Sequence, residues 1–133
     1  MASGIDVLLR ILGLMIKLTR FVFFGLFVRF LVYFYLGLNV RHRHRLPKQG
    51  PVVIVSNHNS HLDTLVLMSL FPYRLLPKLR PMAAADYFLR NRLIAWFSLN
   101  VVGIIPVGRK QARSKNELFL SAGEALEASD MLI

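Results

Sequence analysis

The residues best suited to chemistry lie in one short polar segment, Asn57-His58-Asn59-Ser60-His61-Leu62-Asp63, which follows the apolar run 52–55. On a continuous helix, His58 and Asp63 would point about 140° apart. If His58 instead lies in a loop before the helix, the chain folds back and the Asp63 carboxylate can reach Nδ1 of His58. General-base catalysis requires an imidazole oriented in this way. We therefore predict that His58 is a catalytic base and that Asp63 orients it.

A purely structural interpretation of the same segment is also open. Ser60 and Asp63 fit a capping box, with Ser60 as N-cap and Asp63 at the third helical position. In that case Asp63 satisfies only a backbone N–H, and His58 is a polar loop residue. His61 is the second choice as catalytic base, because at the first helical position its side chain is expected to point away from the pocket that His58 would face. A metal held by His58 and His61 has no further ligand at a suitable spacing, so we expect no metal site.

The elements around this segment alternate between strands and helices. Apolar runs predict strands at 52–56, 79–85, 101–107 and 131–133, and helical periodicity predicts helices at 60–70, 86–99 and 116–128. The expected inward side chains of the last helix are Leu118, Phe119, Ala122 and Leu126. Such alternation indicates an α/β layered domain, here with an N-terminal membrane-associated helix or helical hairpin before it. The first strand reads as fully buried, and the polar segment follows its carboxyl end, where α/β folds bind ligands.

We predict two parts, a membrane-anchoring part at 1–45 and a catalytic part at 46–133. The chain is 55% hydrophobic with a net charge of +10, and no acidic residue lies between Val7 and Leu62. A single helix over 5–38 would be about 50 Å long, against a hydrocarbon core of roughly 30 Å, so we expect it to divide near residue 20.

The two pieces of this N-terminal segment differ in character. The first is expected to lie in the membrane interface. Its charged side chains form a stripe roughly 80° wide and are expected to snorkel toward the headgroups. That stripe consists of Asp6, Arg10, Lys17 and Arg20. The second piece, 21–38, either spans the membrane or forms a hairpin in one leaflet. Arg29 at the centre of a span would cost roughly 2.5–3.5 kcal/mol.

A basic patch, Arg41-His42-Arg43-His44-Arg45, follows at once. Its position next to an apolar segment favours contact with anionic headgroups on the cytoplasmic side over a metal or nucleic-acid tract. We therefore expect a membrane phospholipid surface as partner and no nucleic acid, because the basic residues alternate with aliphatic runs. The chain contains no cysteine, which excludes a cysteine nucleophile.

Two motifs resemble those of a known family. The segment 57–63 resembles the N-H-x-S-x-x-D signature of the glycerolipid acyltransferases, which include the lysophosphatidic acid acyltransferases. The segment Gly103-Ile104-Ile105-Pro106-Val107-Gly108-Arg109 resembles their second motif, in which arginine follows glycine six residues later. The resemblance covers roughly residues 46–133. The family's third motif, Phe-Pro-Glu-Gly-Thr-Arg, would follow 131–133 and is absent, so we expect an N-terminal part of an acyltransferase, incomplete at its C-terminus.

The resemblance implies transfer of an acyl group from acyl-CoA or acyl-carrier protein to the hydroxyl of lysophosphatidic acid, giving phosphatidic acid, with no bound cofactor. His58 would be the base for direct attack, Asp63 its orienting partner, and Arg109 the ligand of the acceptor phosphate. Gly103, Asn57 and Ser60 would also bind substrate. Glycerol-3-phosphate or another lysophospholipid is an alternative acceptor. The alternative of another class is a catalytically incomplete membrane-binding module.

Overall fold

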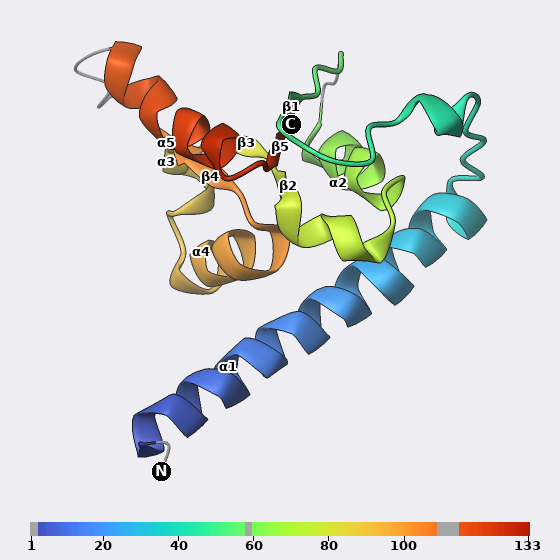
Figure 1. Cartoon of the computed structure of the whole chain (residues 1–133). Coiled ribbons are helices and arrows are strands. Elements are labelled where there is room, and N and C mark those ends of the chain that lie inside the picture. The colour runs from blue at the N-terminus through green and yellow to red at the C-terminus, as the bar shows by residue number, and fades with distance from the viewer. Residues whose placement is uncertain (1–2, 58–59, 109–114) are drawn as a thin grey trace.

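One continuous helix runs from Gly4 to Tyr35 along one side of the molecule in the computed structural model, which describes residues 3–57, 60–108 and 115–133 (Figure 1). It consists of α1 (Gly4–Arg20), the π-helical η1 (Phe21–Val28) and a second π-helical stretch, η2 (Leu31–Tyr35). The expected division near residue 20 and the helical hairpin are therefore wrong. No proline interrupts this segment, and the two π-helical stretches do not break the helix.

The second half of this helix belongs to the hydrophobic core. Phe24, Val28 and Val32 are at most 1% exposed. They pack in one cluster with side chains from the rest of the chain, namely Met68, Phe71, Leu76, Leu79 and Met131. The core therefore includes residues from both sides of the predicted boundary at 45/46, and the boundary itself stays a prediction.

The strands are short and parallel. β1 (Val52–Val53), β5 (Met131–Leu132) and β2 (Leu79–Arg80) form a sheet in the order β1-β5-β2, and β3 (Met82–Ala84) pairs with β4 (Ile105–Val107). Only Pro81, which has no N–H to donate, separates β2 from β3. The ladder continues across it, because the Met82 N–H donates to the Ile133 carbonyl at 2.8 Å and the Ile105 N–H to the Pro81 carbonyl at 2.7 Å. The order is in effect β1, β5, β2–β3, β4.

Helices connect these strands, as the predicted alternation requires. α2 (His61–Ser69) and the 3-10 helix η4 (Tyr73–Lys78) lie between β1 and β2. α3 (Ala85–Phe88) and α4 (Arg92–Phe97), which continues as the π-helical η5 (Ser98–Val102), lie between β3 and β4. α5 (Lys115–Glu127) precedes β5. Another 3-10 helix, η3 (Arg43–Arg45), lies within the basic patch, whose residues are all exposed. The structure is thus a mixed α/β arrangement preceded by a long apolar helix.

Several local predictions are corrected by the structure. The first strand is not fully buried: Val53 is 58% and Val55 89% exposed, since β1 is at the edge of the described sheet and ends at Val53. The helix expected over 86–99 is two helices, and Asn91 caps the longer one, since Asn91 Oδ1 accepts from the Leu93 N–H at 2.8 Å.

The last strand and helix predicted before β5 also differ in detail. The strand expected from residue 101 starts only at Ile105, because Val101 and Val102 still belong to η5. In α5, Ala122 is buried as expected, and Leu126 packs against the same cluster. Phe119 is exposed, so its predicted inward position is wrong. The side chain of Leu118 lies outside the described residues.

Arginines of the N-terminal segment attach it to the domain through main-chain carbonyls. Arg20 donates from Nε to the Val101 carbonyl and from Nη2 to the Asn100 carbonyl, both at 2.8 Å. Arg29 Nη2 donates to the Phe71 carbonyl at 2.9 Å. Carbonyls at the C-terminal ends of helices attract cations, and η5 and α2 end at these positions. The expectation that Arg20 snorkels toward headgroups is therefore wrong.

Candidate active site

The start of α2 is organised by a capping box. Ser60 is the N-cap residue in an extended conformation, and its N–H donates to Asp63 Oδ2 at 3.0 Å. The acidic side chain lies in the first helical turn, where the helix dipole favours negative charge. The predicted capping roles of Ser60 and Asp63 are confirmed. A carboxylate can accept several hydrogen bonds, so a cap does not prevent Asp63 from also orienting an imidazole.

The polar segment follows the end of β1, as predicted. The Ile54 N–H donates to the Leu132 carbonyl at 2.8 Å, so the chain follows the sheet to residue 54 and then leaves it toward α2. Asn57, just before α2, is exposed. His58 lies outside the described residues. Its contact with Asp63 therefore stays a prediction.

Gly103 ends a helix and begins the approach to β4. Its φ of +84° is in the left-handed region, which glycine adopts without strain, and its N–H closes the helix by donating to the Ser98 carbonyl at 2.8 Å. A Cβ here would lie 3.3 Å from Arg20 Nη2. The structure thus assigns Gly103 a structural role, and its predicted contact with substrate stays a prediction. Arg109, which follows β4, lies outside the described residues.

The first motif follows β1, and the second motif contains β4 and ends just after it. All described strand pairs are parallel, so the carboxyl ends of β1 and β4 are at one edge. Two strands lie between them, and three strand spacings amount to about 14 Å. A phosphorylated glycerol together with long side chains can bridge such a separation. This edge is where α/β folds bind ligands.

Aromatic contacts link α2 to α3 beside this edge. The His61 ring stacks on the Tyr87 ring with centroids 4.7 Å apart, and the Phe88 ring meets His61 edge-on at 5.0 Å. His61 is the first residue of α2, as predicted, and its ring is engaged in packing. No sequence spacing pairs these residues, because His61 precedes Tyr87 by 26 positions and the contact depends on the tertiary fold.

A cavity of about 520 Å³ adjoins this aromatic cluster. It is lined by Asp86, Tyr87, Arg90, Asn91 and Ile94. α3 directly follows the carboxyl end of β3. The cavity therefore lies at the same edge of the sheet as the ends of β1 and β4. The cavity combines a carboxylate and a guanidinium with apolar surface, so it can receive a ligand that has both polar and apolar parts. Asp86 and Arg90 are not among the site residues predicted from the sequence.

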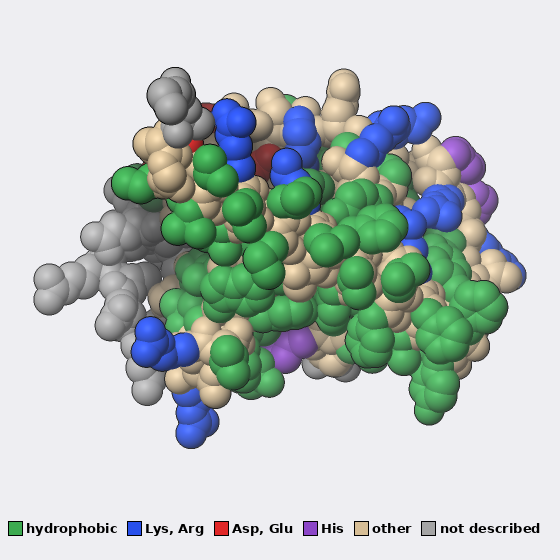
Figure 2. All heavy atoms as spheres, turned by 90° about the horizontal axis from the view of Figure 1, so that it is seen from below, with side chains coloured by type: hydrophobic (Ala, Val, Ile, Leu, Met, Phe, Trp, Pro, Cys, Tyr) green, Lys and Arg blue, Asp and Glu red, His purple; other side chains and the backbone are tan. Residues whose placement is uncertain are grey.

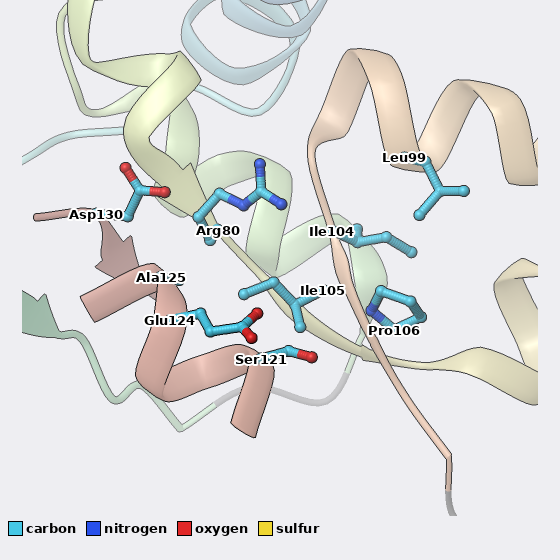
Figure 3. A pocket seen from close by; sticks show the side chains of 9 residues that line it. All are labelled: Arg80, Leu99, Ile104, Ile105, Pro106, Ser121, Glu124, Ala125 and Asp130. Atoms are coloured by element: carbon cyan, nitrogen blue, oxygen red, sulfur yellow. The ribbon is translucent and has the colours of Figure 1, made fainter. Parts of the chain in front are cut away.

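A second cavity, of about 470 Å³, lies at the opposite edge of the sheet (Figure 3). Asp130 precedes β5 and Ile104 precedes β4, so both mark the amino ends of parallel strands. The polar side chains around this cavity include Arg80 and Glu124. It is therefore distinct from the candidate active site. The described residues include no group of three His, Asp or Glu side chains that could hold a metal ion.

Comparisons with known proteins agree with the two motifs. The family described as Acyltransferase matches residues 37–133. A segment of 51 residues is 51% identical to human (Homo sapiens) 1-acyl-sn-glycerol-3-phosphate acyltransferase beta, covering 38% of this chain and 18% of that protein. The chain thus spans less than a fifth of the length of this relative. The search of solved structures found no significant match. Because the family match covers most of the sequence, including both motifs, this chain belongs to the Acyltransferase family.

Proposed function

We propose that the protein transfers a fatty acyl group from acyl-CoA or acyl-carrier protein to the free hydroxyl of lysophosphatidic acid, giving phosphatidic acid. The family match over residues 37–133 carries this proposal. Its acceptor is suggested by the partial similarity to a protein named as a 1-acyl-sn-glycerol-3-phosphate acyltransferase. The arrangement of both motifs at one edge of a parallel sheet supports it.

In the proposed reaction His58 is the general base. The acceptor hydroxyl oxygen attacks the thioester carbonyl carbon while Nε2 of His58 takes the hydroxyl proton. Asp63 accepts the Nδ1 hydrogen of His58, which fixes the tautomer and stabilises the imidazolium. The tetrahedral intermediate then collapses, the C–S bond breaks, and the leaving thiolate takes the proton from the imidazolium. Attack is direct, without an acyl-enzyme, and no cofactor is needed.

Arg109 is proposed to hold the acceptor phosphate. A guanidinium is always charged and can donate two parallel hydrogen bonds to phosphate oxygens. Gly103 contributes by ending η5, so that β4 delivers the following residues to the same sheet edge. Asn57 and Ser60 are proposed to line the acceptor site beside His58, since they flank it in the exposed segment before α2.

The test is an acylation assay by mass spectrometry on the full chain in phospholipid vesicles. Acyl-CoA and acyl-carrier protein are compared as donors, and lysophosphatidic acid, glycerol-3-phosphate and lysophosphatidylcholine as acceptors. His58→Ala should lower the rate by about 10²–10⁴-fold, the usual contribution of a general base. His44→Ala is the matched control, because His44 is an exposed histidine of the basic patch.

Three outcomes would change the proposal. Near wild-type turnover by His58→Ala would refute its role as base, and loss of activity in His61→Ala alone would move that role to His61. An unchanged KM for the acceptor in Arg109→Ala would refute the phosphate contact. Absence of product from the wild-type chain with every donor and acceptor would favour the alternative, a catalytically incomplete membrane-binding module.

We also propose that the protein acts at a membrane, with its site on the cytoplasmic face. The helix Gly4–Tyr35 is long and apolar enough to cross a membrane. The exposed basic patch Arg41–Arg45 follows it closely, and such patches favour the cytoplasmic leaflet. A membrane location also suits an acceptor whose acyl chain lies in the bilayer. Flotation of the full chain with vesicles tests this, and failure to float with anionic vesicles would refute it.

A further inference from the structure

The long helix carries large exposed apolar side chains on the side that faces away from the domain. Six of them are between 48% and 65% exposed: Leu8, Leu12, Met15, Val22, Leu26 and Phe30. Figure 2, which looks at the molecule from below the view of Figure 1, shows hydrophobic side chains spread across this face. Exposed apolar surface on this scale marks a binding surface for a protein or a membrane.

The polar stripe of the same helix lies on the domain side. Arg20, at one edge of the stripe, donates to the Asn100 and Val101 carbonyls, and the Tyr73 hydroxyl donates to the Lys17 carbonyl at 2.9 Å. One turn after Arg20, Phe24 is buried. The first half of the helix therefore turns its polar side toward the domain and its apolar side away from it. An amphipathic helix that lies in the plane of a membrane interface has this arrangement.

The helical segment formed by α4 and η5 extends the apolar face. The rings of Phe23 and Phe97 meet edge-on with centroids 4.8 Å apart, which packs this segment against the long helix. Its side chains remain exposed: Leu93 by 80%, Ile94 by 49%, Trp96 by 44% and Leu99 by 41%. Arg90 and Arg92, just before this apolar segment, are exposed as well. A tryptophan beside aliphatic and basic side chains is typical of membrane interfaces.

The packing of the second half of the helix argues against a membrane span. Phe24, Val28 and Val32 are part of the domain core, and Arg29 is hydrogen-bonded to the Phe71 carbonyl. A span through residues 21–38 would carry the domain into the hydrocarbon or break these contacts. A helix lying in one leaflet keeps all of them.

We propose that the protein docks on a bilayer through this combined face, with the helix Gly4–Tyr35 parallel to the membrane plane and α4–η5 as a second inserted element. The inference rests on the membrane association proposed above and defines its geometry. It adds a membrane contact, centred on Leu93 and Trp96, that lies far along the chain from the N-terminal helix.

An anionic bilayer fits this face better than a second copy of the chain. Arg90 and Arg92 lie just before the exposed apolar segment of α4 and η5, and both are exposed. Two copies meeting face to face would bring these like charges together, in a protein with a net charge of +10. Anionic headgroups instead complement each of them.

The first experiment uses Trp96, which is the single tryptophan of the chain. The full chain is bound to anionic vesicles containing phospholipids brominated at shallow or deep acyl positions, and quenching of Trp96 fluorescence is measured. We expect strong quenching, greater for shallow bromines. The control is the double variant Trp96→Phe, Phe119→Trp, which places the probe at an exposed position of α5. This control should show little quenching, and equal quenching of both proteins would overturn the role of α4–η5.

The second experiment measures the orientation of the helix. In a Trp96→Phe background, tryptophan replaces either Leu12 or Phe30, both exposed on the apolar face. These positions are about 27 Å apart along a helix. A helix in the membrane plane places both probes at the same shallow depth, whereas a span separates their depths by most of the hydrocarbon thickness.

The outcomes separate the inference from the function it rests on. If the protein floats with vesicles but the two tryptophan probes on the long helix lie at unequal depths, the in-plane geometry is overturned and membrane association stays intact. Failure to float would overturn both. Shielding of Trp96 that rises with protein concentration in the absence of vesicles would show that a second copy covers the face. Loss of acyl transfer in His58→Ala with unchanged quenching would leave the docking geometry supported.

Discussion

Replacing Arg20 by methionine tests how the long helix is held to the domain. The guanidinium donates two hydrogen bonds of 2.8 Å to the Asn100 and Val101 carbonyls at the end of η5. Hydrogen bonds from a charged group contribute about 1.5–3 kcal/mol each. Arg20 is only partly buried, so we take the lower end of that range and expect a loss of about 3 kcal/mol. For a chain of this size the melting temperature should fall by about 10 °C.

The assay is urea unfolding of the full chain in mild detergent, followed by Trp96 fluorescence. Arg10→Met is the matched control, because Arg10 is an exposed arginine on the same helix stripe. Arg20→Lys should lose about half as much as Arg20→Met, since an ammonium keeps the charge but lacks the fork that reaches two carbonyls. Burial lowers the pKa of Arg20, yet an arginine stays charged at neutral pH, so this comparison holds there. If the free energies of unfolding of Arg20→Met and the control differ by less than about 0.5 kcal/mol, the attachment is refuted, because surface substitutions stay within that range.

Three further substitutions follow from the packing. Phe24→Ala should lower the free energy of unfolding by about 3–5 kcal/mol, and Phe34→Ala, at a position that is 79% exposed, should change it little; equal effects in urea unfolding would contradict the assigned core. Gly103→Ala should cost about 1–3 kcal/mol, because the residue has φ +84° and the new Cβ presses on Arg20; an unchanged melting temperature would refute this. Asn91→Ala removes the N-cap of α4 and should cost about 1 kcal/mol, with faster amide exchange confined to the first turn of α4.

The capping box and the strand–helix alternation were predictable because both are local. Ser60 and Asp63 interact at a spacing of three residues, which the sequence shows directly. The short apolar run at 131–133 was also predictable as a strand, and it proves to be central in the sheet. The exposure of Val53 and Val55 was not predictable, because it depends on which strands flank β1, and pairing order is not a local property.

The roles of the arginines in the long helix were missed for a related reason. From sequence, Arg29 in an apolar segment implies an energetic cost in a bilayer. Its acceptor is 42 residues away at the end of α2, and the acceptors of Arg20 are 80 and 81 residues away at the end of η5. No spacing rule connects such positions. The stacking of His61 on Tyr87 was missed in the same way.

These two attachments also fix the rotation of the helix about its own axis. A single contact would allow the helix to roll, but Arg20 and Arg29 bind the ends of two different helices, and Phe24 and Val28 are buried between them. The direction of the apolar side is therefore set relative to the sheet and to the edge that both motifs approach. On the proposed docking, that edge stays at a constant height above the bilayer. An acceptor whose acyl chain remains in the membrane requires this, because its hydroxyl can reach His58 only at one height.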